Sequence, residues 1–70
     1  MTGAATTRWQ VVGMTCGHCV SAVREELTAI DGVRSVDVEL ESGTVTVVSE
    51  RPLEPRSVAA AVEEAGYQLA

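Results

Sequence analysis

The stretch Gly13-Met14-Thr15-Cys16-Gly17-His18-Cys19 carries both cysteines of this chain, three positions apart. The run before it, residues 8–12, is rich in β-prone side chains and predicts a strand that ends at Gly13. From about Gly17, apolar side chains recur at the spacing of one helix face, at Val20, Val23, Leu27 and Ile30. The two cysteines are therefore predicted at a strand-to-helix junction.

The remaining sequence predicts a hairpin, a second helix and a short last strand. Residues 36–40 and 44–48 alternate between apolar and polar side chains, so they predict two antiparallel strands. Pro55 suits the first turn of a second helix, where its missing N–H costs nothing. The narrow apolar face of that helix is formed by Val58, Ala61, Val62 and Ala65. Residues 67–70 are long enough for a final strand, with an unanchored tail as the alternative.

The order strand, helix, strand, strand, helix, strand predicts an α+β fold of the ferredoxin-like βαββαβ type. In this fold a four-stranded antiparallel sheet carries both helices on one face. We expect residues 1–7 to form a flexible N-terminus and residues 8–70 to form a single domain. The loop after the first strand and the loop before the last strand share one end of such a sheet. Tyr67 is therefore expected close to Cys16 and Cys19.

Composition excludes several classes of function. Seventy residues allow one domain and make a deep enzyme cleft improbable, so we expect a protein that is not an enzyme. The net charge of −5, from ten acidic residues against five arginines, argues against nucleic acid as a partner. The sequence shows neither a secretory leader nor a run long enough to insert into a membrane, which predicts a cytoplasmic protein. In a reducing compartment, two cysteines favour metal binding or catalysis over a structural disulfide.

The predicted position of the cysteines favours a soft-metal site. A thiolate, rather than a thiol, binds metal, and the N–H groups and positive dipole at a helix start favour negative sulfur. Two thiolates with few other donors suit Cu(I), whereas structural Zn²⁺ typically takes four ligands. Cys16, Cys19 and His18 supply three at most. The residues alone therefore favour Cu(I) as the bound ion.

The C-x-x-C spacing also leaves two alternatives open. The string Cys16-Gly17-His18-Cys19 looks like the active site of protein disulfide isomerases, which would make the chain a small dithiol–disulfide oxidoreductase. Those enzymes use a longer thioredoxin-like domain and typically have Trp before the first cysteine, where this sequence has Thr15. The second alternative is a carrier of another soft metal, such as Zn(II) or Hg(II).

Over residues 8–70 the chain resembles the heavy-metal-associated (HMA) domain, and most closely the small bacterial CopZ-like copper chaperones. The residues that carry this resemblance are Gly13-Met14-Thr15-Cys16 with Cys19, Gly32-Val33 with Val36 and Val38, and Ala65-Gly66-Tyr67. The resemblance implies a Cu(I) chaperone whose ligands are Cys16 and Cys19. It also implies metal transfer, by thiolate exchange, to the N-terminal metal-binding domain of a copper-exporting P-type ATPase. A copper-responsive repressor is a second candidate partner, and a copper-bridged homodimer a candidate assembly.

The same resemblance assigns roles to three neighbours of the cysteines. Met14 would anchor the metal loop on the core, as buried methionines commonly do, and is not expected to be a ligand. His18 would tune thiol protonation or join a copper cluster in a dimer, with an exposed loop histidine as the equal alternative. Tyr67 would act beside the sulfur atoms, with simple packing after Gly66 as its alternative role.

Overall fold

The computed structural model describes residues 4–14 and 17–70. The chain forms six elements in the order β1 (Ala5–Val12), α1 (Gly17–Thr28), β2 (Val33–Glu39), β3 (Thr44–Ser49), α2 (Pro55–Glu64) and β4 (Gln68–Leu69). Because β4 pairs with β1, the prediction of a final strand is confirmed over that of an unanchored tail.

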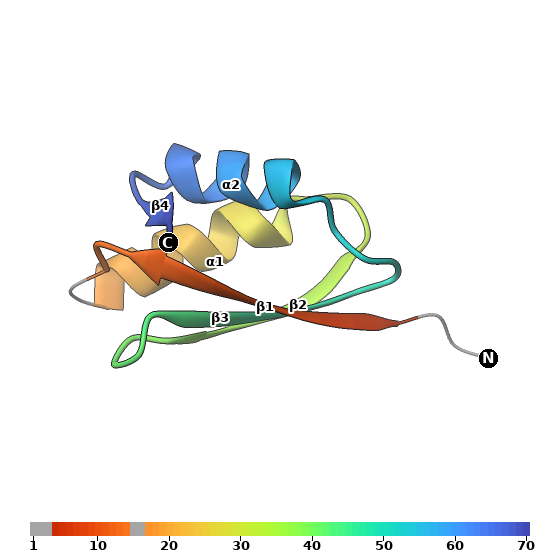
Figure 1. The fold of residues 1–70 in the computed structure, drawn as a ribbon, viewed down its shortest axis with the longest axis horizontal. Coiled ribbons are helices and arrows are strands. Elements are labelled where there is room, and N and C mark those ends of the chain that lie inside the picture. Colours follow the sequence, from red (N-terminus) through yellow and green to blue (C-terminus); the bar gives the residue numbers. More distant parts are fainter. Residues whose placement is uncertain (1–3, 15–16) are drawn as a thin grey trace.

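The strands form one antiparallel sheet in the order β2-β3-β1-β4. Both helices lie on the same face of this sheet, with α1 and α2 side by side (Figure 1). The predicted ferredoxin-like βαββαβ fold is therefore confirmed. Among the residues that the structure describes, neither helix is long and apolar enough to cross a membrane.

Strand β1 begins earlier than the sequence predicts. Ala5, Thr6 and Thr7 pair with the last residues of β3, from Ser49 to Val47, so residues 5–7 belong to the sheet. Residues 5–7, which the sequence assigns to a flexible N-terminus, thus lie in β1. The physical reason is that β3 continues to Ser49 and supplies ladder partners, to which β-branched threonines are well suited.

The core consists almost entirely of small aliphatic side chains. The buried cluster is formed by Val11, Val45 and Val47 from the sheet, Val23 and Leu27 from α1, and Val58, Ala61 and Val62 from α2. Leu40 does not join it, because β2 ends at Glu39 and leaves Leu40 in the hairpin turn with 38% of its surface exposed. The prediction that the strand alternation continues to residue 40 is therefore wrong by one position.

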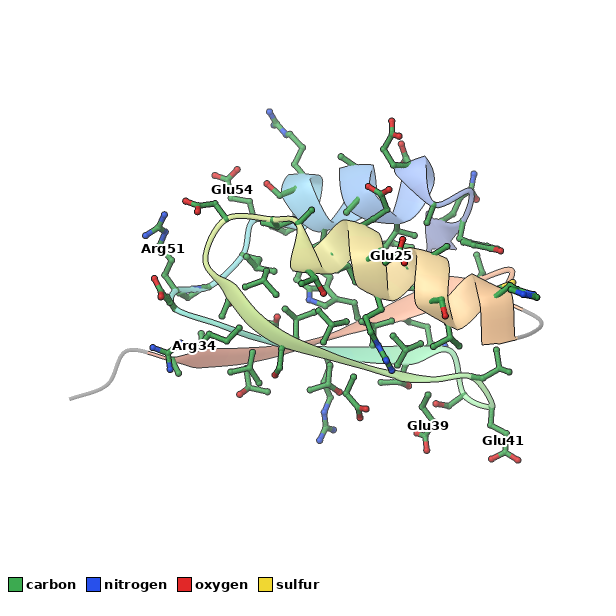
Figure 2. The ribbon with its side chains drawn as sticks, turned by 180° about the vertical axis from the view of Figure 1, so that it is seen from behind. Glu25, Arg34, Glu39, Glu41, Arg51 and Glu54 are labelled. Carbon is green, nitrogen blue, oxygen red and sulfur yellow. The ribbon has the colours of Figure 1, made fainter. Side chains whose placement is uncertain are left out.

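Charged side chains project outward from the surface of this small core. Figure 2 shows Glu39 and Glu41 at the β2–β3 turn, and Arg34 and Arg51 at the opposite end of the molecule. The β2–β3 turn lies beside the end of β1, since the N–H of Val11 donates a 2.8 Å hydrogen bond to the carbonyl of Gly43. The end of β1 is thus fixed by the hairpin on one side and by β4 on the other.

Candidate metal site

Cys19 lies in the first turn of α1, which begins at Gly17. Its side chain points inward, and only 6% of its surface is exposed. The N–H groups of a first helical turn have no partner within the helix, so the sulfur of Cys19 lies where negative charge is favoured. Cys16 and Thr15, which the sequence places in the same loop, lie outside the described residues.

Tyr67 follows the end of α2, and its side chain contacts the sulfur of Cys19. Its hydroxyl donates a hydrogen bond to Cys19 Sγ at 2.7 Å, across 48 positions of sequence. The predicted closeness of Tyr67 to the cysteines is therefore confirmed for Cys19. Tyr67 therefore does more than pack after the Gly66 turn, because its hydroxyl has a specific partner, Cys19 Sγ, in the candidate metal site.

The end of α2 fixes the backbone of Tyr67. Gly66 adopts a φ of +96°, and its N–H donates to the carbonyl of Glu63 at 2.9 Å. The N–H of Tyr67 donates to the carbonyl of Val62 at 3.0 Å, which is the bonding pattern of a helix closed by a left-handed glycine. The hydrogen bonds that close α2 thus hold the backbone of Tyr67, and the side chain extends from there to Cys19.

Gly13 ends β1 directly beside the Tyr67 ring. Its φ is +96°, and a Cβ built on it would lie 3.2 Å from Cδ1 of Tyr67. The sequence predicts Gly13 as the end of a strand and as part of the motif that carries the resemblance, but it does not predict this contact. The contact depends on the register of the β1–β4 pairing, in which Val12 pairs with Gln68 and residues 13 and 67 come next.

Met14 and His18 occupy different environments. Met14 is partly buried and packs against the hydrophobic core, as expected for a residue that holds the loop down. His18 is exposed on the first turn of α1. Across residues 4–14 and 17–70, no three His, Cys, Asp or Glu side chains gather in a way that could hold a metal ion. The sequence has two cysteines, so two thiolates from one chain would have to come from Cys16 and Cys19.

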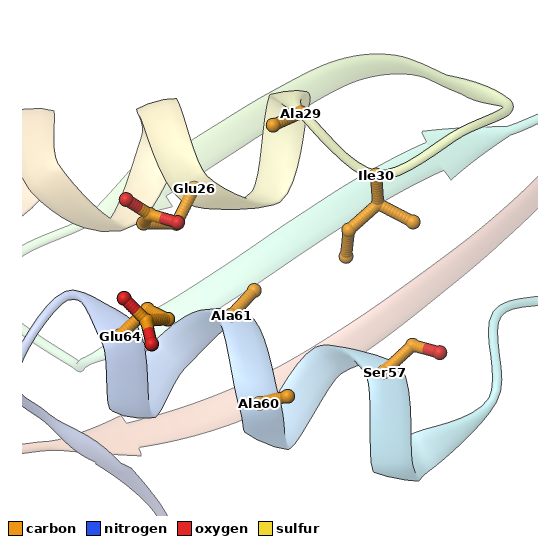
Figure 3. A pocket seen from close by; sticks show the side chains of 7 residues that line it. All are labelled: Glu26, Ala29, Ile30, Ser57, Ala60, Ala61 and Glu64. Carbon is orange, nitrogen blue, oxygen red and sulfur yellow. The ribbon is translucent and has the colours of Figure 1, made fainter.

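A separate open groove runs between the two helices and involves none of these residues. Its lining consists mainly of small side chains, with one glutamate from each helix (Figure 3); the residues are Glu26, Ala29, Ile30, Ser57, Ala60, Ala61 and Glu64. It contains no thiol or imidazole. Among the described residues, the thiol of Cys19 and the imidazole of His18 both lie in the first turn of α1, outside this groove.

Comparison with known proteins identifies the family. The heavy-metal-associated domain matches residues 8–68 of this chain. The chain belongs to the heavy-metal-associated family. The copper chaperone CopZ of Staphylococcus aureus is 45% identical to this family member over 60 residues, which cover 84% of the chain and 88% of that relative.

Solved structures agree with this assignment. A CopZ metallochaperone superposes with a TM-score of 0.85 at 40% identity, covering 94% of this chain and all of that one. The N-terminal domain of a potential copper-translocating P-type ATPase from Bacillus subtilis, solved in the Cu(I)-loaded state, gives a TM-score of 0.83 at 29% identity. That match covers 94% of this chain and 84% of the ATPase domain. The string Cys16-Gly17-His18-Cys19 thus belongs to a heavy-metal-associated fold and not to the thioredoxin-like fold of disulfide isomerases.

Proposed function

We propose that this heavy-metal-associated protein is a cytoplasmic Cu(I) chaperone, not an enzyme, that carries its cargo between the thiolates of Cys16 and Cys19. The observation that carries the proposal is the environment of Cys19, whose inward-facing sulfur lies in the first turn of α1 and receives the Tyr67 hydroxyl. The similarity to the CopZ copper chaperone supports the choice of ion.

The chemistry of the donors supports Cu(I) over harder or more highly coordinated ions. Thiolates are soft ligands, and a pair of them satisfies a soft ion that accepts low coordination, whereas structural zinc takes four ligands. His18 is exposed, so its imidazole is available to a second molecule or to solvent. An ion held by only two thiolates can still accept thiolates of a partner, which favours transfer over storage.

The proposed recipient is the N-terminal metal-binding domain of a copper-exporting P-type ATPase. The likeness of this chain to such a domain from B. subtilis supports the idea, because two similar sites can exchange an ion through intermediates that share their thiolates. A copper-responsive repressor is the second proposed partner. Both proposals are tested by mixing the Cu(I)-loaded chain with each purified recipient and measuring where the metal resides after separation.

Anaerobic Cu(I) titration of the reduced protein against a chromophoric Cu(I) chelator tests the site. We expect Cys16→Ser and Cys19→Ser each to lower the affinity by more than about 100-fold, above the range typical of losing an outer hydrogen-bond partner. His18→Ala is the matched control, because His18 lies between the two cysteines but is exposed, and its affinity should stay within a few-fold of the parent. Parent-like affinity in either cysteine variant would refute the site.

Two rival functions and one candidate assembly are distinguished by parallel measurements. A carrier of Zn(II) or Hg(II) would retain that ion in competition with Cu(I). A dithiol–disulfide oxidoreductase would reduce insulin at a useful rate, which we do not expect. A copper-bridged dimer would double the solution mass when Cu(I) is added to the apo protein. In that dimer His18→Ala would lower the yield of any copper cluster, although it leaves the monomer's affinity unchanged.

A further inference from the structure

Gly13 and Tyr67 face each other at the point where the β1–β4 ladder ends. The last pair of that ladder is Val12 with Gln68, so the next pair in the same antiparallel register is Gly13 with Tyr67. Directly opposite side chains in a sheet are close neighbours. Here one of the two positions has no side chain, and the ring of the other occupies that space, because a Cβ on Gly13 would lie 3.2 Å from Cδ1 and 4.0 Å from Cε1.

The Tyr67 ring is held at both of its ends. At the backbone end, the N–H of Tyr67 donates to the carbonyl of Val62 at 3.0 Å. At the far end, the hydroxyl donates to Cys19 Sγ at 2.7 Å. Cys19 is in turn part of α1 and almost fully buried. The ring therefore has little freedom to move away from Gly13 without disturbing one of these contacts.

We propose that Gly13 is a positioning residue for the metal site, because its lack of a side chain lets the Tyr67 ring hold its hydroxyl on the sulfur of Cys19. A methyl group on Gly13 would be closer to the ring than ordinary contact allows, so the ring would have to shift by a few tenths of an ångström. The contact is at Cδ1, near the backbone, and the hydroxyl lies at the far end of the ring. If the ring rotates away from the methyl group, the hydroxyl therefore moves farther than Cδ1 does.

The consequence is control of the reactivity of one sulfur by a residue that does not touch it. The hydrogen bond from Tyr67 draws electron density from the sulfur, which lowers the intrinsic nucleophilicity of the thiolate toward an incoming electrophile. Gly13 acts only through Tyr67. The importance of this arrangement for copper handling rests on the proposed function, in which Cys19 is a ligand.

Alkylation of the reduced, metal-free protein tests the proposal without any copper. The protein is treated with iodoacetamide over a series of pH values, and the tryptic peptide of residues 9–24, which contains both cysteines, is mapped by tandem mass spectrometry. The readout is the ratio of the Cys19 thiolate rate constant to that of Cys16, each fitted from the pH series. Tyr67→Phe should raise this ratio about twofold, because a hydrogen bond worth about 1 kcal/mol lowers thiolate nucleophilicity with a Brønsted coefficient of about 0.4–0.5. Gly13→Ala should also raise this ratio. The double variant Gly13→Ala with Tyr67→Phe should have the same ratio as Tyr67→Phe alone.

Gly32→Ala is the matched control. Gly32 has a φ of +90°, close to that of Gly13, but a Cβ there would meet nothing within 4 Å, so this variant carries the same backbone strain without the ring contact. We expect its ratio to equal that of the parent, because a methyl group on Gly32 does not contact the Tyr67 ring. A parent-like ratio in Gly13→Ala, or factors that multiply in the double variant, would overturn the proposal.

A second variant and a direct measurement guard against loss of folding. Gly13→Asn introduces a Cβ with a side chain that tolerates left-handed backbone, and it replaces Gly13→Ala if the latter does not fold. In the parent, a nuclear Overhauser effect between Hα of Gly13 and the ring protons of Tyr67 is expected, and its absence would also overturn the proposal. All of these measurements use apo protein, so a failure of Cu(I) binding would refute the proposed function and leave them unaffected.

Discussion

At the scale of single residues, Gly43 is the described glycine at which an added side chain would meet its nearest neighbour at the shortest distance. Its φ is +74°, and a Cβ there would lie 2.6 Å from the carbonyl oxygen of Val11, which is backbone and cannot swing away. The carbonyl of Gly43 also accepts the hydrogen bond from the N–H of Val11. Gly43 therefore fixes how closely the hairpin approaches β1, two residues before Gly13.

We predict that Gly43→Ala lowers the free energy of unfolding by about 2–4 kcal/mol, through backbone strain together with separation of the hairpin from β1. Gly32→Ala, with a similar φ and open space, should cost only about 1–2 kcal/mol. Urea denaturation followed through the single tryptophan, Trp9, measures both variants. Equal losses would show that the contact with Val11 contributes nothing beyond the strain.

The residue scale also shows what sequence reasoning reaches at the candidate site. The closeness of Tyr67 to Cys19 follows from the order of the elements, because the fold places the start of α1 and the end of α2 at one end of the sheet. The contact between the Tyr67 ring and Gly13 does not follow from strand order. It depends on the register of the two-residue strand β4 and on the absence of a side chain at Gly13, and hydrophobic periodicity reveals neither.

At the scale of elements, the last inward-facing side chain of β3 is polar, whereas the two before it are apolar. Val45 and Val47 are followed by Ser49, which is fully buried and donates a 2.6 Å hydrogen bond from its hydroxyl to the carbonyl of Arg51. This bond lies where the chain leaves the strand toward α2, and among the described residues no buried side-chain nitrogen or oxygen lacks a hydrogen-bond partner. We expect the bond to define where β3 stops.

Ser49→Ala should therefore destabilise the protein by about 1 kcal/mol, the net value of one hydrogen bond. Nearby, Arg51 also lies 4.0 Å from Asp31, but both side chains are largely in water, so Asp31→Asn should leave stability unchanged. Thermal unfolding of the two variants under identical buffer conditions gives the comparison. An Asp31→Asn loss as large as that of Ser49→Ala would contradict the assignment of the turn to the buried hydroxyl.

Element boundaries were less predictable than element types, for a physical reason. Periodicity identifies both helices and the hairpin because each of these elements has one buried face. Residues 5–7 are small or polar and give no such signal, yet they form strand because the neighbouring β3 continues to Ser49. Leu40 shows the converse: its alternation matches a strand, but the turn that closes at Gly43 begins before it.

At the scale of the whole molecule, a thin aliphatic core makes stability sensitive to binding. A chain of 70 residues buries only about 60% of the surface that its unfolded form exposes, so its stability is small to begin with. Anything that binds the folded form alone stabilises it by mass action. Under the proposed function, Cu(I) would join the start of α1 to the loop after β1, and thereby connect two elements that also contribute to the core.

We predict a large rise in melting temperature when Cu(I) is buffered at about 100 times its dissociation constant. Binding at that ratio is worth about 2.7 kcal/mol, and each kcal/mol moves the midpoint of a domain of this size by about 4–8 °C, so the expected rise is roughly 10–20 °C. Anaerobic circular dichroism with a Cu(I)-buffering chelator measures it, and excess chelator should reverse it. The double variant Cys16→Ser and Cys19→Ser serves as the control and should melt at one temperature with or without copper. A rise of the same size in that variant would place the bound copper away from the dithiol at the start of α1.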